Sequence, residues 1–203
     1  MKPLLKLAFI SVAFLGITSA GNGQEVLTFD NLPTTPPAPG EAAAGYIPDG
    51  YGGLDWSDFG VINGLEVGPS YGYYTGVVSG SNVAFNEYGG TGTISNPYAF
   101  NLHSADLTAA LNLNTPLEIQ VEGFQGTTMA YNNTYTVNNL GPTLINFNYL
   151  SVDRVEFISS PAQQFAMDNL NVTVPLPVPE PGSMGLMLVA GLAGALVKSR
   201  RLV

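Results

Sequence analysis

The sequence predicts an all-β body, folded as an antiparallel β-sandwich of jelly-roll type, between two terminal segments of different character. Short runs rich in β-branched and aromatic residues recur about every ten residues, separated by Gly, Pro and Asn. No stretch of residues 21–174 sustains the apolar period of about 3.6 residues that an amphipathic helix needs. A body with about nine to eleven such strands is expected to pack two antiparallel sheets face to face.

Strict alternation gives the clearest single strand. In residues 117–122, Leu, Ile and Val alternate with Glu and Gln, which indicates one buried and one solvated face. By the same criteria we expect strands at about 25–30, 53–59, 75–79, 82–86, 91–95, 105–111, 116–124, 127–137, 143–149, 152–158 and 164–174. The segment 105–111 is also compatible with a short helix.

Proline and glycine mark two segments as irregular. Residues 33–53 hold five Pro and five Gly and predict a long loop. Residues 175–181 have Pro at every other position and are expected to form a stiff, extended linker. The body at 21–174 is therefore expected to end where this linker begins.

The N-terminus has the pattern of a secretory signal peptide. Lys2 and Lys6 precede an apolar stretch over residues 7–17, and small residues follow up to Ala20. This order of basic, apolar and small residues predicts export and cleavage after Ala20 by signal peptidase. Residues 1–20 are therefore excluded from the predicted fold.

The C-terminal region 182–203 has the pattern of a short transmembrane helix with a basic tail. The apolar run 182–197 has sixteen residues, about 24 Å as a helix at ~1.5 Å per residue, which is near the lower limit for spanning a bilayer. Lys198, Arg200 and Arg201 follow and predict a cytoplasmic C-terminus.

The same region carries a family resemblance. Pro179-Glu180-Pro181, the apolar run and the basic residues Lys198, Arg200 and Arg201 together resemble the PEP-CTERM sorting signal of exported Gram-negative bacterial proteins. The resemblance implies that an exosortase in the inner membrane recognises the tripeptide and cleaves near it. The mature chain would then end near Pro181, after transient residence in the inner membrane. It would reach the cell surface or extracellular matrix, in an exopolysaccharide or biofilm context.

The charge of the body excludes several partners. Residues 21–174 contain fourteen Asp and Glu against the single Arg154, a net charge near −13. Nucleic acid requires a basic footprint, and this body has none. Calcium and neutral polysaccharide remain as partners. The chain contains no cysteine, which excludes thiolate nucleophiles and thiolate metal sites.

Two Asp-Asn pairs form the candidate metal site. Asp30-Asn31 ends the first predicted strand, and Asp168-Asn169 lies in the last, where the apolar phase slips as in a β-bulge. In jelly-roll folds of the carbohydrate-binding type the terminal strands are usually neighbours, and this resemblance implies a structural calcium site formed by the two pairs. The alternative is that both pairs only terminate or kink strands.

Aromatic residues form the candidate glycan site. Tyr46, Tyr51, Trp56, Tyr71 and Tyr73 lie in or near a Gly-rich segment that also carries carboxylates. Aromatic rings stack on sugar faces, and carboxylates accept hydrogen bonds from hydroxyls. The alternative is that Trp56 belongs to the core, with the tyrosines covering the edge of the sandwich.

Catalysis has weak support in the sequence. His103 is the only histidine, and no Gly-x-Ser-x-Gly elbow is present to supply a nucleophile. Carboxylates for glycoside hydrolysis are available but form no recognisable constellation; they are Asp55, Asp58, Glu118, Glu122 and Glu156. We therefore expect a non-enzymatic exported protein, with a calcium-dependent carbohydrate-binding module as the second hypothesis and a glycoside-active enzyme as the third.

Overall fold

The computed structural model describes residues 22–113, 115–160 and 162–175. The predicted signal peptide, the PEP tripeptide, the C-terminal apolar run and the basic tail lie outside the described residues. Within the described ranges, no helix has the length and apolar character needed to cross a membrane.

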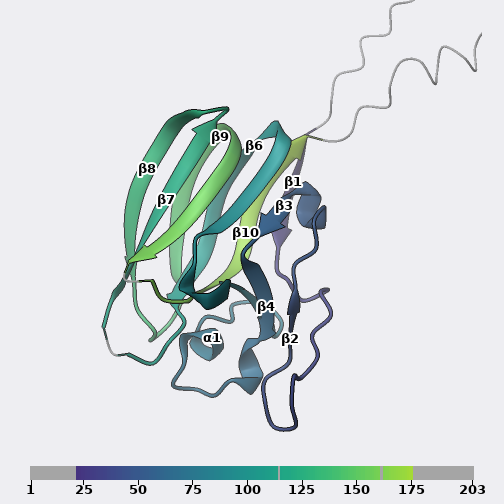
Figure 1. The fold of residues 1–203 in the computed structure, drawn as a ribbon, viewed down its shortest axis with the longest axis vertical. Coiled ribbons are helices and arrows are strands. Elements are labelled where there is room, and N and C mark those ends of the chain that lie inside the picture. Colours follow the sequence, from purple (N-terminus) through teal and green to yellow (C-terminus); the bar gives the residue numbers. More distant parts are fainter. Residues whose placement is uncertain (1–21, 114, 161, 176–203) are drawn as a thin grey trace, which may run out of the picture. The chain divides into compact units, whose positions relative to one another are not determined.

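Every strand pair in the described residues is antiparallel, and all the strands belong to one sheet (Figure 1). The strands are β1 (Asn22–Leu27), β2 (Ala44–Tyr46), β3 (Asp55–Ser57), β4 (Phe59–Asn63), β5 (Asn82–Asn86), β6 (Gly92–Ala109), β7 (Leu117–Gln125), β8 (Thr128–Val137), β9 (Thr143–Ser160) and β10 (Phe165–Pro175). The sheet runs in the order β2-β4-β5-β10-β6-β9-β7-β8, with β1 added to β10 and β3 added to β6. The all-β antiparallel class is therefore confirmed, but one continuous sheet replaces the two that were predicted.

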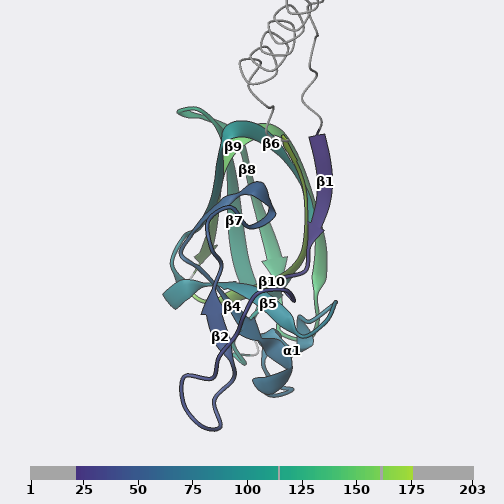
Figure 2. The same ribbon diagram turned by 90° about the vertical axis from the view of Figure 1, so that its right-hand side faces the viewer.

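The sheet bends where the two longest strands change register. β6 and β9 have 18 residues each, and their ladder shifts between Ser95 and Phe100 and again before Ser104. Asn148 and Ser151 of β9 have positive φ angles of 53° and 56° at this point. Extra residues and left-handed conformations kink a strand and increase its twist. One limb of the sheet then contains β7 and β8, the other contains β10, β5 and β4, and Figure 2 shows the curvature between them.

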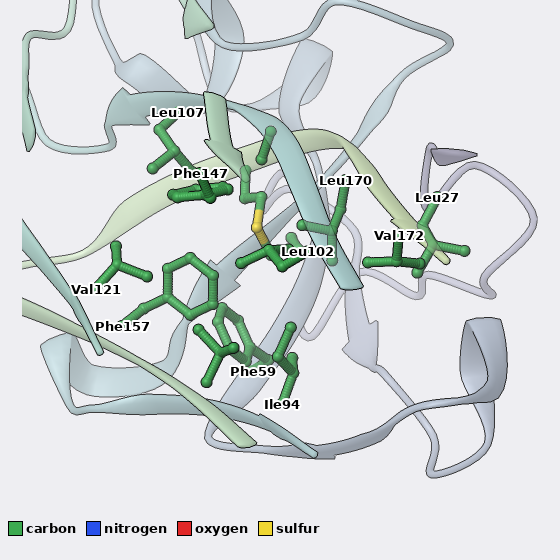
Figure 3. Packing of buried hydrophobic residues seen from close by; sticks show 14 of the residues in the cluster. Leu27, Phe59, Ile94, Leu102, Leu107, Val121, Phe147, Phe157, Leu170 and Val172 are labelled. Atoms are coloured by element: carbon green, nitrogen blue, oxygen red, sulfur yellow. The ribbon is translucent and has the colours of Figure 1, made fainter. Parts of the chain in front are cut away.

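The core lies between the two limbs. Tyr149, in the first half of β9, stacks on Tyr131 of β8 with ring centroids 4.4 Å apart. Phe157 contacts Phe59 and Phe165 at centroid distances of 5.9 and 6.0 Å, and Figure 3 shows Phe59 and Phe157 packed among the aliphatic side chains. A fully buried side chain of this size contributes about 1.5–3 kcal/mol. Apolar packing between the limbs therefore holds the bent sheet closed.

The predicted strands differ from the structure at five places, and at the first the predicted strand 53–59 is divided between β3 and the start of β4. The pairs 91–95 with 105–111, and 143–149 with 152–158, are parts of the single strands β6 and β9. The segment 105–111 is extended up to residue 109, and so the helical alternative is wrong. The predicted strand at 75–79 is instead the end of helix α1 (Gly72–Thr75) and a loop, whereas residues 44–46 of the predicted loop form β2.

Two glycines allow helix α1 to pack closely against strand β6. A Cβ at Gly72 would collide with the carbonyl oxygen of Ala109, and one at Gly76 would lie 2.8 Å from the Thr108 hydroxyl. The two glycines thus bring α1 directly onto the backbone of β6, against the outer face of the sheet. Short 3-10 turns complete the connections; they are η1 (Tyr51–Gly53), η2 (Gly64–Glu66) and η3 (Glu87–Gly89).

Candidate functional site

The two Asp-Asn pairs converge on one segment. Strand β1 pairs with β10, with Leu27 opposite Leu170, so that the terminal strands of the body are neighbours, as predicted. Asp30 follows β1 and Asp168 lies within β10. Both carboxylates contact residues 78–82, which follow α1 and end at the first residue of β5.

Asp168 is fully buried and binds the start of this segment. Its Oδ2 accepts hydrogen bonds from the backbone N–H groups of Val78 (2.8 Å) and Ser79 (2.9 Å), and its Oδ1 accepts from the N–H of Asn169 (2.7 Å). Burial raises the pKa of the Asp168 carboxyl, while these hydrogen bonds oppose the rise. The register shift after Asp168 and the positive φ of Asn169 (49°) confirm the predicted β-bulge, which turns this carboxylate toward the segment.

Asp30 binds the end of the same segment. Its Oδ1 accepts from the N–H groups of Ser81 (2.7 Å) and Asn82 (3.0 Å). Gly80, with a φ of 52°, lies so close to this carboxylate that a side chain there would collide with it. The Asn82 amide in turn donates to two carbonyl oxygens in the turn after β1. We call Asp30 and Asp168, with the segment 78–82, the carboxylate clamp.

Three of the four carboxylate oxygens of the clamp, Oδ1 of Asp30 and both oxygens of Asp168, accept backbone N–H groups. Asn31 accepts a hydrogen bond from the Tyr51 hydroxyl (2.9 Å), and the Asn169 amide donates to Asp106 (3.3 Å). Across residues 22–113, 115–160 and 162–175, no three His, Cys, Asp or Glu side chains group closely enough to hold a metal ion. The calcium site remains a prediction, and the visible role of the two carboxylates is to hold a loop against the terminal strands.

Three of the predicted glycan-contacting aromatics are packed. Trp56 is 8% exposed, lies edge-on to Phe59, and donates its Nε1–H to the carbonyl oxygen of Tyr51 (3.0 Å). Tyr51 is half-buried, and its oxygen accepts the N–H of Phe29 (3.1 Å). Tyr73 is 7% exposed and donates its hydroxyl proton to a glutamine. These three rings therefore pack within the body, whereas Tyr71 and Tyr46 remain exposed at 40% and 81%.

Tyr46 belongs to an aromatic surface formed by three strands. Tyr46 of β2 lies opposite Gly60 of β4, which lies opposite Phe85 of β5. Residues directly opposite one another share a face of the sheet. A Cβ at position 60 would lie 2.7 Å from Cζ of Phe85, so the half-buried Phe85 ring extends over Gly60 toward Tyr46. We call Tyr46, Gly60 and Phe85 the aromatic strip.

The surroundings of the strip combine apolar and acidic groups. A shallow cavity of about 450 Å³ adjoins it, lined by Pro33, Thr35, Ala44, Gly45, Tyr46 and Pro48. On the other side, Oε1 of Glu87 lies 3.3 Å from the position that a Cβ of Gly60 would take. Sequence reasoning missed Gly60 and Phe85, because only the register of β2, β4 and β5 places them beside Tyr46.

The acidic residues considered for hydrolysis are distributed over separate elements. Glu122 of β7 and Glu156 of β9 are cross-strand partners, and they are the nearest pair that the pairing register brings together. Glu156 forms an ion pair with Arg154 (Nε to Oε1, 2.9 Å, without hydrogen-bond alignment), and the Arg154 guanidinium lies 4.0 Å from the Phe124 ring centre. Glu122 accepts a hydrogen bond from Gln120 (2.8 Å). Both carboxylates therefore have structural partners.

The other candidates lie apart from this pair. Asp55 is the first residue of the short strand β3 and Asp58 follows its end, and Glu118 is exposed near the start of β7. Nε2 of His103 lies 2.8 Å from the Thr173 hydroxyl, across the pair formed by β6 and β10.

Comparison with known proteins gives little further constraint. No family model matches the sequence. No curated protein matches it either. Among solved structures, the chain is similar to TmCBM61 in complex with beta-1,4-galactotriose, with a TM-score of 0.36 and 10% identity over 65% of this chain and 99% of that one. A likeness of this size supports no conclusion about the fold or ligand of this chain.

Proposed function

We propose that this chain is an exported, non-enzymatic protein of the cell surface or extracellular matrix, and that its β body binds neutral polysaccharide at the aromatic strip. The main observation behind this proposal is the exposure of Tyr46, which is 81% exposed and in register with Gly60 and Phe85. An exposed ring of this size on a regular strand contributes little to folding. It remains available to a ligand.

The dimensions of the strip suit an extended sugar chain. Tyr46 and Phe85 are two strands apart, roughly 9.5 Å between their backbones. Pyranose rings present apolar C–H faces to aromatic rings, and their hydroxyls require polar partners. Glu87 lies beside the strip and supplies an acceptor. A neutral, linear polysaccharide running across the strands would meet both rings and the carboxylate.

Charge selects between classes of polysaccharide. The body has fourteen acidic residues and one arginine, so an anionic polymer would be repelled at most points of approach. A neutral polymer meets no such repulsion. The strip therefore favours neutral hexose polymers over uronic-acid or sulfated ones.

Affinity electrophoresis of the full chain through gels containing neutral polysaccharides tests the proposal. Tyr46→Ala should weaken retardation about two- to tenfold, the value of one lost aromatic contact. Tyr98→Ala is the matched control, since Tyr98 is 69% exposed on β6, outside the three strands of the strip. Equal binding by both variants, or no retardation by any polysaccharide in the panel, would contradict the proposal.

The same gels separate the alternative functions. A calcium-dependent carbohydrate-binding module would lose retardation in chelator and recover it with calcium, while the strip alone predicts no change. A glycoside-active enzyme would release reducing ends from the polysaccharide, and neutralising one of its carboxylates would stop that release.

The face-to-face packing of the two limbs supports placing the body among β-sandwiches of jelly-roll type.

The sorting proposal rests on residues outside the described ranges. Pro179-Glu180-Pro181 and the basic end formed by Lys198, Arg200 and Arg201 would direct exosortase cleavage after export. Intact-mass measurement of the surface fraction should show a chain that begins near residue 21 and ends near Pro181. A surface protein that retains Arg200 and Arg201 would refute cleavage of the tail.

A further inference from the structure

Strand β8 is an unusually unprotected edge. It ends the strand order, and in the described part of the chain it pairs only with β7. Its ten residues, TMAYNNTYTV, include no charged residue and no proline. Natural proteins normally protect an edge of this length with lysine, proline, strong bulges or a covering loop. The one register shift in the ladder of β7 and β8 lies near the start of β8, opposite Gly123 and Phe124.

The sequence of β8 is self-complementary. If a second copy of β8 aligns antiparallel with Asn133 at the centre, most side chains meet one of a similar kind. The opposing pairs are Asn132 with Thr134, Tyr131 with Tyr135, Ala130 with Thr136, and Met129 with Val137. Polar groups face each other at Asn132 and Thr134, aromatic rings at Tyr131 and Tyr135, and apolar side chains at Met129 and Val137, while the small Ala130 side chain meets a threonine. Such pairs are the unit of stabilisation between strands.

The charges around β8 permit this pairing in an otherwise acidic body. Glu122 lies opposite Asn132, which would face Thr134 of the second copy, and Thr134 lies opposite Gln120. A row across the junction thus begins at a carboxylate and ends at an amide. Glu122 of one copy is three strand spacings, about 14 Å, from the β7 strand of the other copy along that row. This distance exceeds the Debye length of about 8 Å at physiological ionic strength, so salt screens the charge of Glu122 across the junction. No carboxylate of one copy faces a carboxylate of the other along it.

The inner face of β8 is already ordered for pairing. Tyr131 stacks on Tyr149, and the Tyr149 hydroxyl donates to Asn133 Oδ1 (2.9 Å) and contacts the carbonyl oxygen of Val121 (2.9 Å). Tyr135 lies edge-on to Phe147. Residues that are fixed before association lose little conformational entropy when a partner arrives.

We propose that two copies of this chain associate through β8, antiparallel and centred on Asn133, to continue the sheet from one copy into the other. The interface is isologous, because each copy contributes the same strand. It does not depend on polysaccharide binding, since β2 and the aromatic strip are at the other end of the strand order.

The absence of cysteine from the chain allows a register-specific test. Asn133→Cys places one thiol in each copy at directly opposing positions, within disulfide reach of one another. Asn146→Cys is the matched control, because Asn146 is an exposed asparagine on β9, outside β8. The full chain is purified in mild non-ionic detergent and oxidised. We expect a covalent dimer from Asn133→Cys at a rate well above that of Asn146→Cys. Equal rates would overturn the proposal.

A charge variant tests the same interface without a cross-link. Thr134→Asp in both copies places two carboxylates on a diagonal of roughly 7–8 Å across the pairing, which should weaken association about five- to tenfold at low salt. Asn146→Asp adds the same charge outside β8 and should have little effect. Sedimentation velocity gives the dimer fraction, and circular dichroism confirms that each variant folds. A folded Thr134→Asp variant that dimerises like the Asn146→Asp variant, or a parent chain that is monomeric throughout, would refute the interface.

Discussion

Removal of the Asp168 carboxylate is the most direct test of how the body is held together. Asp168 is fully buried and accepts three backbone hydrogen bonds, from Val78, Ser79 and Asn169, at 2.7–2.9 Å. The Ser79 hydroxyl adds a fourth, longer contact at 3.2 Å. In Asp168→Ala the three backbone donors lose their acceptor at once, whereas the Ser79 hydroxyl keeps Asn169 Oδ1 as an acceptor (2.9 Å), and the side chain leaves a small void.

The cost follows from the fate of the donors. A buried donor left without a partner costs about 1–3 kcal/mol, and hydrogen bonds to a charged acceptor lie in the upper part of that range. Val78 is 47% exposed, so water replaces part of what the loop loses. We therefore expect Asp168→Ala to lower the free energy of unfolding by about 3–5 kcal/mol, a large share of the 5–15 kcal/mol typical of a domain.

Urea unfolding followed by tryptophan fluorescence measures this cost, because Trp56 is the only tryptophan and is packed in the core. At about 2–4 °C per kcal/mol, the melting midpoint should fall by roughly 6–20 °C. Asp55→Ala removes an exposed aspartate at the start of β3 and should change the free energy of unfolding by no more than about 0.5 kcal/mol. A cost below about 1 kcal/mol for Asp168→Ala, with an unchanged denaturant slope, would show that the segment 78–82 does not depend on the clamp.

The clamp also makes two predictions about solution conditions. Burial raises the pKa of Asp168, so as pH falls the folded protein binds a proton at this carboxyl before the unfolded chain does. The protonation of Asp168 therefore stabilises the fold most below the unfolded pKa of about 3.9. This contribution declines as pH rises through the raised folded pKa. Asp168→Asn should therefore cost more at acidic pH than at pH 7, and a cost that shrinks on acidification would contradict the assigned shift. Because Oδ1 of Asp30 and both oxygens of Asp168 already accept N–H groups, we expect calcium to leave the melting midpoint of the chelated chain unchanged, whereas a rise would support the predicted calcium site.

The strands that alternate strictly could be predicted, and those that bend could not. Leu117, Ile119 and Val121 of β7 are buried as their period of two requires. In β9 the alternation is interrupted near Asn148 and Ser151, which suggests a turn between two strands. Both residues instead take left-handed conformations inside one strand. A break in alternation has the same appearance in a turn and in a bulge, because both add a residue out of phase.

The candidate site shows a second limit of prediction from the sequence. Tyr46 was identified from its residue type, but Gly60 and Phe85 acquire their roles from a register across three strands that are distant in sequence. The short strand β2 was missed because its neighbourhood is rich in Pro and Gly, which locally favour a loop. Pairing with β4 overrides that local preference. Both aspartates of the clamp could be identified because each begins an Asp-Asn pair after an apolar segment, and the bulge at Asp168 also leaves a visible slip in the apolar phase.

The strand order separates the two proposed surfaces, and this separation bears on how they would work together. The aromatic strip involves β2 at one end of the order, and the unprotected strand β8 is at the other. Pairing through β8 therefore leaves both strips free and places two of them in one assembly. A polymer with repeated sugar units would then bind the second strip at the effective concentration set by the first, so that weak single contacts give strong retention without any new contact. If the proposed surface role is right, the one strip of a single copy would hold a polysaccharide weakly, and two copies joined edge to edge would hold it more strongly.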